Sequence, residues 1–316
     1  MQQNGITVLS LFDGMSCGQI ALERANIPVN KYYASEIDEK SIAVTQKNYP
    51  NTIQLGDVTK IDLNELPCID LLIGGSPCQD LSRGNPKGKG LRGTRSGLFW
   101  TYVDIWSKVK PKYFLLENVE MNFESEHIIS ETLGVKPIII NSNLVSCQNR
   151  KRLYWTNIPD IEQPKDKRIF IKDIIYDDTY KIFTDERISK TKRITKNGNY
   201  VKYDLSGKGY WSQQDRAYFK NKKMCCLPKA NPGNKMNIVL DFDKDIYRRI
   251  HPIEAERCQN VPDNYTLLEG VSEVNRLEML GNGWTVDVIA HILKNIRKEP
   301  QKKSKENIIF FDEIRR

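Results

Sequence analysis

Short apolar runs alternate with helical stretches along the first half of the chain. The helical stretches are Ile20–Ala25, Ser41–Asn48 and the apolar-periodic segment Leu98–Val109. The apolar runs predict buried strands at Ile6–Phe12, Tyr32–Glu36, Ile69–Gly74, Tyr113–Glu117, Ile138–Asn141 and Leu153–Thr156, with a further strand before Gly56. Strands separated by helices indicate βαβ units, so the predicted fold class is α/β, with a parallel sheet covered by helices on both faces.

The hydrophobic pattern changes after Pro159. Residues 160–245 are polar, basic and irregular, with short alternating pieces at Tyr200–Leu205 and Asn237–Asp241. Helical patterns return at Pro252–Cys258 and Val286–Ile296. These shifts divide the chain into a first part at 1–159, a small separate domain at 160–245, a helical part at 246–296, and a charged linker and tail at 297–316.

Positive charge is concentrated in the middle of the chain. The whole sequence carries a net charge of +8. Residues 181–235 contain 14 Lys and Arg against four Asp and Glu, a net charge of +10, so the rest of the chain carries −2. A basic segment of this kind is typical of a surface that faces a polyanion, and a solvated basic surface is the alternative.

The composition narrows the class of protein. With 316 residues, 39% of them hydrophobic and 28% charged, the chain is an ordinary globular protein. It has no long apolar run and no signal peptide pattern at its start, so we expect neither a membrane span nor secretion, and a cytoplasmic location. Seven cysteines without a C-x-x-C pair favour a reducing compartment and argue against a zinc site. The three histidines are widely spaced, so we predict no metal site.

Candidate ligand-binding residues follow the first three predicted strands. The stretch from Leu9 to Gly18 runs from a strand through a glycine turn into a helix, an arrangement with which α/β proteins bind nucleotide-like ligands. Glu36 ends the next strand, where a carboxylate can hold ribose hydroxyls. Asp57 follows the third strand and either accepts from an adenine amino group or caps a helix.

A candidate nucleophile follows the fourth strand. The run Gly74–Gln79 presents Cys78 at the carboxyl edge of the sheet, where open α/β sheets bind their ligands. The thiolate is the reactive form of cysteine, so the site should be electropositive. Residues 80–97 are rich in glycine, lysine and arginine and predict a mobile basic flap. The alternative is a structural cysteine in a loop.

Two further motifs carry charged side chains. Glu117 lies at the end of the next strand, where a sheet of suitable order would bring it beside Cys78. Arg150 and Arg152 are two residues apart on a predicted strand, and therefore on one face. Arg-x-Arg is also a common exposed pattern.

Taken in order, these blocks resemble the DNA (cytosine-5)-methyltransferase family. The resemblance covers nearly the whole chain except 160–245 and the tail. The matching blocks are Phe12-Asp13-Gly14, Glu36, Asp57, Pro77-Cys78-Gln79, Glu117-Asn118-Val119, Gln148-x-Arg150-x-Arg152, the block from Arg248 to Arg257, and Gly281-Asn282-Gly283-Trp284.

The resemblance implies a mechanism. The fold would be a Rossmann-like S-adenosylmethionine-dependent methyltransferase sheet with a small inserted target-recognition domain. Cys78 would attack C6 of a cytosine flipped out of duplex DNA, and Glu117 would hydrogen-bond N3 and the exocyclic amine. Arg150 and Arg152 would steady the nucleophile loop and the ring oxygen O2. A methyl group would then pass to C5, leaving S-adenosylhomocysteine.

The resemblance also assigns the cofactor site. Phe12 would stack on adenine, Glu36 would hold the ribose and Asp57 the adenine amine, while Gly14 and Gly18 would form the turn at the methionine part. Residues from the C-terminal part would complete the pocket, which implies that 246–296 folds back on the first part. The full predicted set is Phe12, Asp13, Gly14, Gly18, Glu36, Ile37, Asp57, Val58, Asn282, Trp284 and Thr285.

The sequence departs from the family pattern at several positions. Ser16 and Cys17 stand before Gly18 where glycine-rich sequence is frequent, and His251 stands where threonine is usual, a position interpreted as structural. Trp284 replaces a small aliphatic residue. The combination of Trp284 with Phe12-Asp13-Gly14 is similar to the animal de novo cytosine methyltransferases. The short chain without regulatory domains favours a compact prokaryotic or phage enzyme.

The unmatched segment 160–245 lies where the family has its target-recognition domain, so the expected partner is double-stranded DNA. A restriction endonuclease acting separately on the same site is a further possible partner. The expected DNA-binding residues are Ser82, Arg83, Arg95, Gln213, Gln214 and Arg216. Two alternatives are a tRNA cytosine-5 methyltransferase, against which the separate basic domain argues, and a catalytically silent DNA-binding homologue, against which the complete catalytic set argues.

Overall fold

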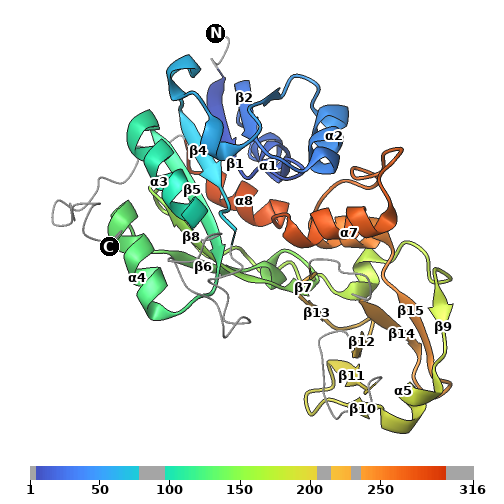
Figure 1. Cartoon of the computed structure of the whole chain (residues 1–316). Coiled ribbons are helices and arrows are strands. Elements are labelled where there is room, and N and C mark those ends of the chain that lie inside the picture. Colours follow the sequence, from blue (N-terminus) through green and yellow to red (C-terminus); the bar gives the residue numbers. More distant parts are fainter. Residues whose placement is uncertain (1–4, 78–96, 205–214, 229–235, 297–316) are drawn as a thin grey trace. The chain divides into compact units, whose positions relative to one another are not determined.

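The structure is a computed structural model that describes residues 5–77, 97–204, 215–228 and 236–296 (Figure 1). The chain forms two compact units. Unit 1 comprises residues 1–140, 151–163 and 288–316, and unit 2 comprises 141–150 and 164–287.

Unit 1 is built on a seven-stranded sheet with the order β3-β2-β1-β4-β5-β8-β6. Strands β1 to β5 run parallel, so their carboxyl ends lie at one edge of the sheet. The strands are β1 Ile6–Leu11, β2 Val29–Ser35, β3 Ile53–Gln54, β4 Leu71–Gly74, β5 Tyr113–Val119, β6 Ile138–Asn141 and β8 Lys151–Thr156. The predicted α/β class is confirmed, and the described strands match the predicted ones closely.

The sequence predicted a parallel sheet, but the sheet contains an antiparallel pair of strands. Strand β8 pairs antiparallel with β5, with Leu115 opposite Thr156 and Val119 opposite Arg152. Residues 142–150 connect β6 to β8. A parallel neighbour needs a crossover of about a dozen residues or more, commonly a helix, so this short connection does not allow one.

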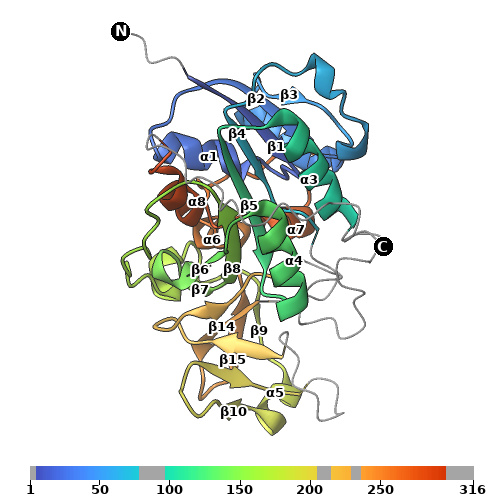
Figure 2. The ribbon, with the colours of Figure 1, turned by 90° about the vertical axis from the view of Figure 1, so that its left-hand side faces the viewer.

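Helices cover both faces of the sheet. In Figure 2, α1 and α8 lie on one side of the strands, and α3 and α4 lie on the other. The helices with residues in unit 1 are α1 Cys17–Arg24, α2 Glu39–Asn48, α3 Gly97–Val109, α4 Phe123–Leu133 and α8 Val286–Leu293, with 3-10 turns at Val58–Lys60 and Leu63–Glu65. Helix α4 was not predicted, although Asn122 accepts from the Ser125 amide at its start and Gly134 ends it with a φ of 69°.

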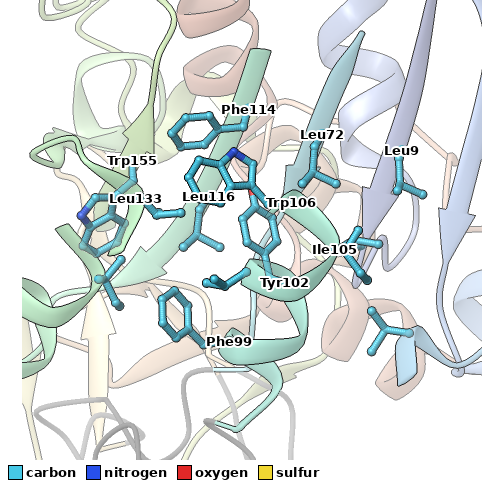
Figure 3. Close-up of a cluster of buried hydrophobic side chains, with 14 of the residues drawn as sticks. Leu9, Leu72, Phe99, Tyr102, Ile105, Trp106, Phe114, Leu116, Leu133 and Trp155 are labelled. Carbon is cyan, nitrogen blue, oxygen red and sulfur yellow. The ribbon is translucent and has the colours of Figure 1, made fainter. Parts of the chain in front are cut away.

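Helix α3 fixes β4 and β5 from one side (Figure 3). Its residues Phe99, Tyr102, Val103 and Trp106 repeat at helical spacing and are buried in one cluster with apolar residues of β1, β4 and β5. The Trp106 and Phe114 rings meet edge to face, with their centroids 5.5 Å apart. Burial of each such side chain contributes roughly 1.5–3 kcal/mol, so the strand ends that carry the candidate site rest on a rigid core.

Unit 2 contains a six-stranded sheet with the order β10-β11-β12-β14-β15-β9. Its core includes Ile188, Val201, Tyr203, Val239 and Tyr247. The strands are β9 Ile182–Phe183, β10 Arg193–Ile194, β11 Tyr200–Lys202, β12 Arg216–Tyr218, β14 Asn237–Asp241 and β15 Ile246–Arg249, and β7 Gln148–Asn149 pairs with β13 Met224–Cys225. The helices are α5 Glu186–Thr191, α6 Pro252–Cys258 and α7 Glu273–Asn282, with 3-10 turns at Ser142–Leu144 and Ile171–Ile174. Across the described ranges of both units, no helix combines the length and apolar character needed to cross a membrane.

Candidate active site

The parallel strands of unit 1 bring candidate side chains to one edge of the sheet. Phe12 to Gly14 follow β1, Glu36 follows β2, Asp57 follows β3, Ser76 follows β4, and Glu117 lies near the end of β5. Ligands of open α/β sheets bind at this carboxyl edge. The order of the strands therefore assembles the predicted residues of unit 1 in one region.

Glu36 holds the turn between β1 and α1. Its Oε2 accepts from the Gly14 amide at 2.7 Å, and its Oε1 accepts from the Ile37 and Asp38 amides at 2.8 and 2.9 Å. Gly14 has a φ of 59°, and a Cβ at this position would meet no atom within 4 Å. The turn thus leaves open space beside Gly14 and a fixed carboxylate facing it, which suits a ligand with hydroxyl groups. Gly18, predicted in the same turn, lies in the first turn of α1.

Asp13 is held inside this turn by two hydroxyl groups. Tyr32 Oη donates to Asp13 Oδ1 at 2.8 Å, and Ser16 Oγ donates to Oδ2. Burial, with a smaller contribution from the nearby Glu36 carboxylate, raises the pKa of Asp13 to about 6, against the lowering effect of these hydrogen bonds. Ser16, a departure from the family pattern, therefore has a structural function. The hydrogen bond from Tyr32 was not predicted, because Tyr32 lies on another strand.

The other residues predicted around the cofactor have different environments. Ile37 is 74% exposed, and Val58 is buried. Asp57 caps the 3-10 helix Val58–Lys60, because its Oδ1 accepts from the Thr59 amide at 3.0 Å and from the Thr59 hydroxyl at 2.8 Å. These hydrogen bonds lower the pKa of Asp57. The helix cap that the sequence allowed is present.

Glu117 and Arg152 form an ion pair across two strands. The distance from Arg152 Nε to Glu117 Oε1 is 3.0 Å, and the side chains are only 15% and 11% exposed. Arg152 lies opposite Val119, two residues from Glu117, so the two side chains are diagonal neighbours on one face. A guanidinium beside a carboxylate in a largely buried position can stabilise charge that develops on a bound ring.

Arg150 belongs to unit 2, whereas Arg152 belongs to unit 1. The predicted continuous strand is interrupted at Arg150, whose amide donates to Asn141 Oδ1 at 3.0 Å. Its guanidinium donates to the carbonyl oxygens of Gly281 and Gly283 at 3.2 and 2.9 Å, and to Cys226 Sγ at 3.0 Å. The expectation of one strand that carries both arginines is wrong, because Arg150 lies between β7 and β8 and belongs to neither strand.

A buried polar network in unit 2 holds the segment before α8. Gln259 Nε2 donates to the Leu280 carbonyl at 2.6 Å and to the Gly283 carbonyl at 3.2 Å. Gln259 Oε1 accepts from Gln148 Nε2 and from Thr285 Oγ1, both at 2.8 Å. Gln259 was not predicted, although its position two residues after the block from Arg248 to Arg257 was a signal. The network fixes Thr285 and the backbone beside Asn282 and Trp284.

The block from Arg248 to Arg257 also has structural functions. Arg248 donates to both carboxylate oxygens of Glu254 at 2.8 and 2.9 Å, and both side chains are fully buried. His251 Nδ1 accepts from the Ile253 amide at 3.1 Å and caps α6. Burial lowers the pKa of His251, which favours the neutral ring that this cap needs. These contacts support the structural interpretation of His251.

Of the expected DNA-binding residues, the structure describes Arg216. It lies on β12, and its guanidinium is 5.0 Å from the centre of the Tyr200 ring. The predicted residues outside the described part of the chain are the candidate nucleophile Cys78 and the expected DNA-binding residues Ser82, Arg83, Arg95, Gln213 and Gln214.

The chain belongs to the C-5 cytosine-specific DNA methylase family, whose model matches residues 6–298. It is 28% identical over 339 residues to the type II methyltransferase M.FnuDI from Fusobacterium nucleatum, a match that covers 94% of this chain and 96% of that protein. It is also 29% identical over 225 residues to the orphan methyltransferase M.Rho11sI from Bacillus phage rho11s. The second match covers 66% of this chain and only 41% of the phage protein.

The fold agrees with this family. A DNMT2 mutant from Spodoptera frugiperda superposes with a TM-score of 0.65 at 19% identity, over 92% of this chain and 99% of that structure. The predicted fold class and family are therefore confirmed.

Proposed function

We propose that this protein transfers a methyl group from S-adenosylmethionine to C5 of a cytosine in a specific duplex DNA sequence, acting in the cytoplasm of a prokaryotic cell. The ion pair between Glu117 and Arg152, at the carboxyl edge of a sheet of this family, carries the proposal. The strand that precedes Cys78 pairs directly with the strand that carries Glu117. The nucleophile and the acid are thus contributed by neighbouring strands.

The proposed chemistry begins on the flipped cytosine. The Cys78 thiolate forms a bond to C6, and the electron pair of the C5–C6 double bond moves towards C5 and the ring. Glu117 hydrogen-bonds N3 and the exocyclic amine, which stabilises the protonated ring, and Arg152 keeps the carboxylate oriented beside it. Arg150 donates to the carbonyl oxygens of Gly281 and Gly283 and so holds the backbone of this segment. Once C5 has used this electron pair to bond the methyl group that the cofactor would supply, the C5 proton leaves, the pair of that C–H bond restores the C5–C6 double bond, and Cys78 departs with the pair of the S–C6 bond.

S-adenosylmethionine supplies the electrophilic methyl group when it is bound. Glu36 fits the ribose, because both of its oxygens are fixed by backbone amides and Gly14 leaves open space beside them. Phe12 would stack on the adenine, Asp57 would accept from its amine while it caps the 3-10 helix, and Ile37 and Val58 would line its surroundings. Asn282, Trp284 and Thr285 would contribute from the segment held by Gln259.

Unit 2 supplies the DNA-binding charge in this proposal. It contains all of residues 181–235, whose net charge is +10. Lysines and arginines would bind phosphates, while Arg216, Gln213 and Gln214 would contact bases. Ser82, Arg83 and Arg95 would contact the DNA near the flipped base. A cognate restriction endonuclease would act separately on the same sequence.

Bisulfite sequencing tests the reaction, the substrate and the specificity together. Plasmid DNA is sequenced from a host that expresses the protein, beside a host that expresses the Cys78→Ser variant. We expect protected cytosines at one recurring motif in the first sample and none in the second, with duplex binding largely retained by the variant. Protection in both samples would contradict the covalent mechanism. Protection in neither would contradict the DNA reaction, and the same cofactor would then be tested with tRNA.

A further inference from the structure

Asn118 links the strand that carries Glu117 to the loop that leads to Cys78. The side chain of Asn118 is 1% exposed and that of Ser76 is 4% exposed. Asn118 Nδ2 donates to Ser76 Oγ at 3.1 Å and lies 3.3 Å from the Ser76 carbonyl oxygen, to which it also donates. Asn118 Oδ1 accepts from the Val119 amide at 2.8 Å. The amide group is therefore engaged at both ends.

The two neighbouring residues of β5 serve opposite sides of the strand. Successive side chains of a strand point to opposite faces, so Glu117 reaches Arg152 while Asn118 reaches the loop after β4. Strand β5 is itself held between β4 and β8. A displacement of Asn118 relative to Glu117 would require this central strand to deform.

The end of β4 allows little movement of its own. A Cβ at Gly74 would lie 3.0 Å from the Leu11 carbonyl oxygen and 3.1 Å from Tyr102 Cε2. The backbone therefore passes closely between β1 and α3. Ser76 lies two residues after Gly74. The ring of Pro77, the next residue, restricts the φ of Pro77 itself to about −65°. With Cα atoms about 3.8 Å apart along the chain, Cys78 is attached within roughly 7 Å of Ser76.

We propose that Asn118 is a positioning residue for the nucleophile. Its amide holds Ser76, and Ser76 and Pro77 transmit this restraint to Cys78, so that one strand sets the separation of the nucleophile from Glu117. This inference rests on the proposed function, because it assumes that Cys78 attacks C6. Asn118 contacts neither the reacting atoms nor the cofactor in this proposal.

The addition step can be followed without any methyl donor. The Cys78 thiolate forms the S–C6 bond, and the electron pair that moves to C5 takes up a proton from water. The hydrogen first present at C5 then leaves as a proton, the pair of that C–H bond restores the C5–C6 double bond, and the S–C6 bond breaks with its electrons returning to sulfur. A tritium label at C5 of cytosine is therefore released to water only if Cys78 adds to C6.

The decisive experiment measures tritium release from unmethylated plasmid DNA that carries [5-³H]cytosine, without cofactor. Asn118→Asp keeps the side-chain shape but loses the donor while it is ionised, and Asn118→Ala removes the group. We expect release to fall roughly 100-fold in both variants, because a displacement of about 1 Å can cost this much, while the Kd for DNA and for S-adenosylmethionine stays within about threefold. Asn118→Asp should recover relative to wild type as the pH is lowered from about 8 to 6, because burial at this position raises the pKa of the introduced carboxyl and its protonated form can donate to Ser76.

Asn157→Asp is the matched control. Asn157 also joins two backbone groups with one amide, accepting from the Phe114 amide and donating to the Lys112 carbonyl, each at 2.9 Å, at the opposite end of β5. Tritium release within about threefold of wild type in the Asn118 variants would overturn the proposal. An equal loss in Asn157→Asp, or a parallel loss of DNA binding, would also overturn it in favour of a general structural effect. Absence of release by wild type would instead refute the proposed function itself.

Discussion

At the scale of single residues, hydrogen bonds hold the backbone around the predicted ligand-binding residues. Glu36 uses both carboxylate oxygens to hold backbone amides of two turns, and Asp13 is held by the hydroxyls of Ser16 and Tyr32. Phe12 and Ser16 adopt φ values of 58° and 59°, which few residues other than glycine adopt readily. The hydrogen bonds of Asp13 and Glu36 compensate for this strain at the end of β1.

The pH dependence of stability should report on Asp13. Its folded-state pKa is raised from 3.8 to about 6, so the folded state binds more protons than the unfolded chain between these values. The free energy of unfolding therefore decreases as the pH rises from about 4 to 6. Relative to Asp13→Asn, which does not titrate, wild type should lose roughly 1–3 kcal/mol across this range. Urea denaturation of both proteins at a series of pH values measures the difference, and parallel curves would contradict this assignment.

At the scale of elements, buried polar side chains fix the segments that regular hydrogen bonding leaves open. The segment between α7 and α8 is held by Gln259 and by Arg150, and α6 begins at the His251 cap. Arg248 and Glu254 add a fully buried ion pair at the start of the same helix. Such groups are stable inside a protein because each has its partners, and removal of one partner is costly.

Replacement of Gln259 should test this network. Gln259→Leu removes a donor to the Leu280 carbonyl and one of the two acceptors of the Gln148 amide, so we expect a loss of roughly 1–3 kcal/mol in the free energy of unfolding. The KM for S-adenosylmethionine should also rise, because Thr285 loses its acceptor. The matched control is Gln163→Leu, since exposed Gln163 donates to a single carbonyl, that of Ile139. Equal stability losses in the two variants would show that the buried network has no special weight.

At the scale of the whole molecule, the chain passes repeatedly between its two units. Residues 141–150 belong to unit 2, whereas the flanking strands β6 and β8 lie mainly in unit 1. The motif from Gln148 to Arg152 is thus divided, with Arg150 bound to the segment at Gly281 and Gly283 and Arg152 bound to Glu117. Two arginines of one motif, two positions apart, therefore support different units.

The salt dependence of DNA binding should locate the basic surface. Arg193 and Lys196 are exposed in unit 2, and each phosphate contact contributes about −0.9 to the slope of log Kobs against log salt. The double substitution Arg193→Gln and Lys196→Gln should make the slope less steep by up to about 2. Lys31→Gln with Lys108→Gln removes two exposed positive charges from unit 1 and is the control. A larger effect of the control, measured by fluorescence anisotropy, would place the DNA-binding charge in unit 1.

The sequence by itself determined most elements of unit 1, apart from α4, and the residues that end its strands. Strands and helices are encoded by local periodicity, so β6 agrees with its predicted bounds and β1, β4 and α3 agree within one or two residues. Because parallel strands end at one edge, the positions of Glu36, Asp57 and Glu117 at that edge also followed from the order of the motifs. Unit 2 was less predictable, because its strands of two to five residues are too short to show a period.

Only the tertiary structure decided which residues meet. Hydrophobic pattern indicates which face of a strand is buried but not which strand lies beside it, and so the antiparallel position of β8 could not be predicted. The contacts from Tyr32 to Asp13 and from Asn118 to Ser76 join residues 19 and 42 positions apart, and Arg150 meets Gly281 across 131. Such pairings depend on the packing of the whole chain, because no local preference of either residue favours the other.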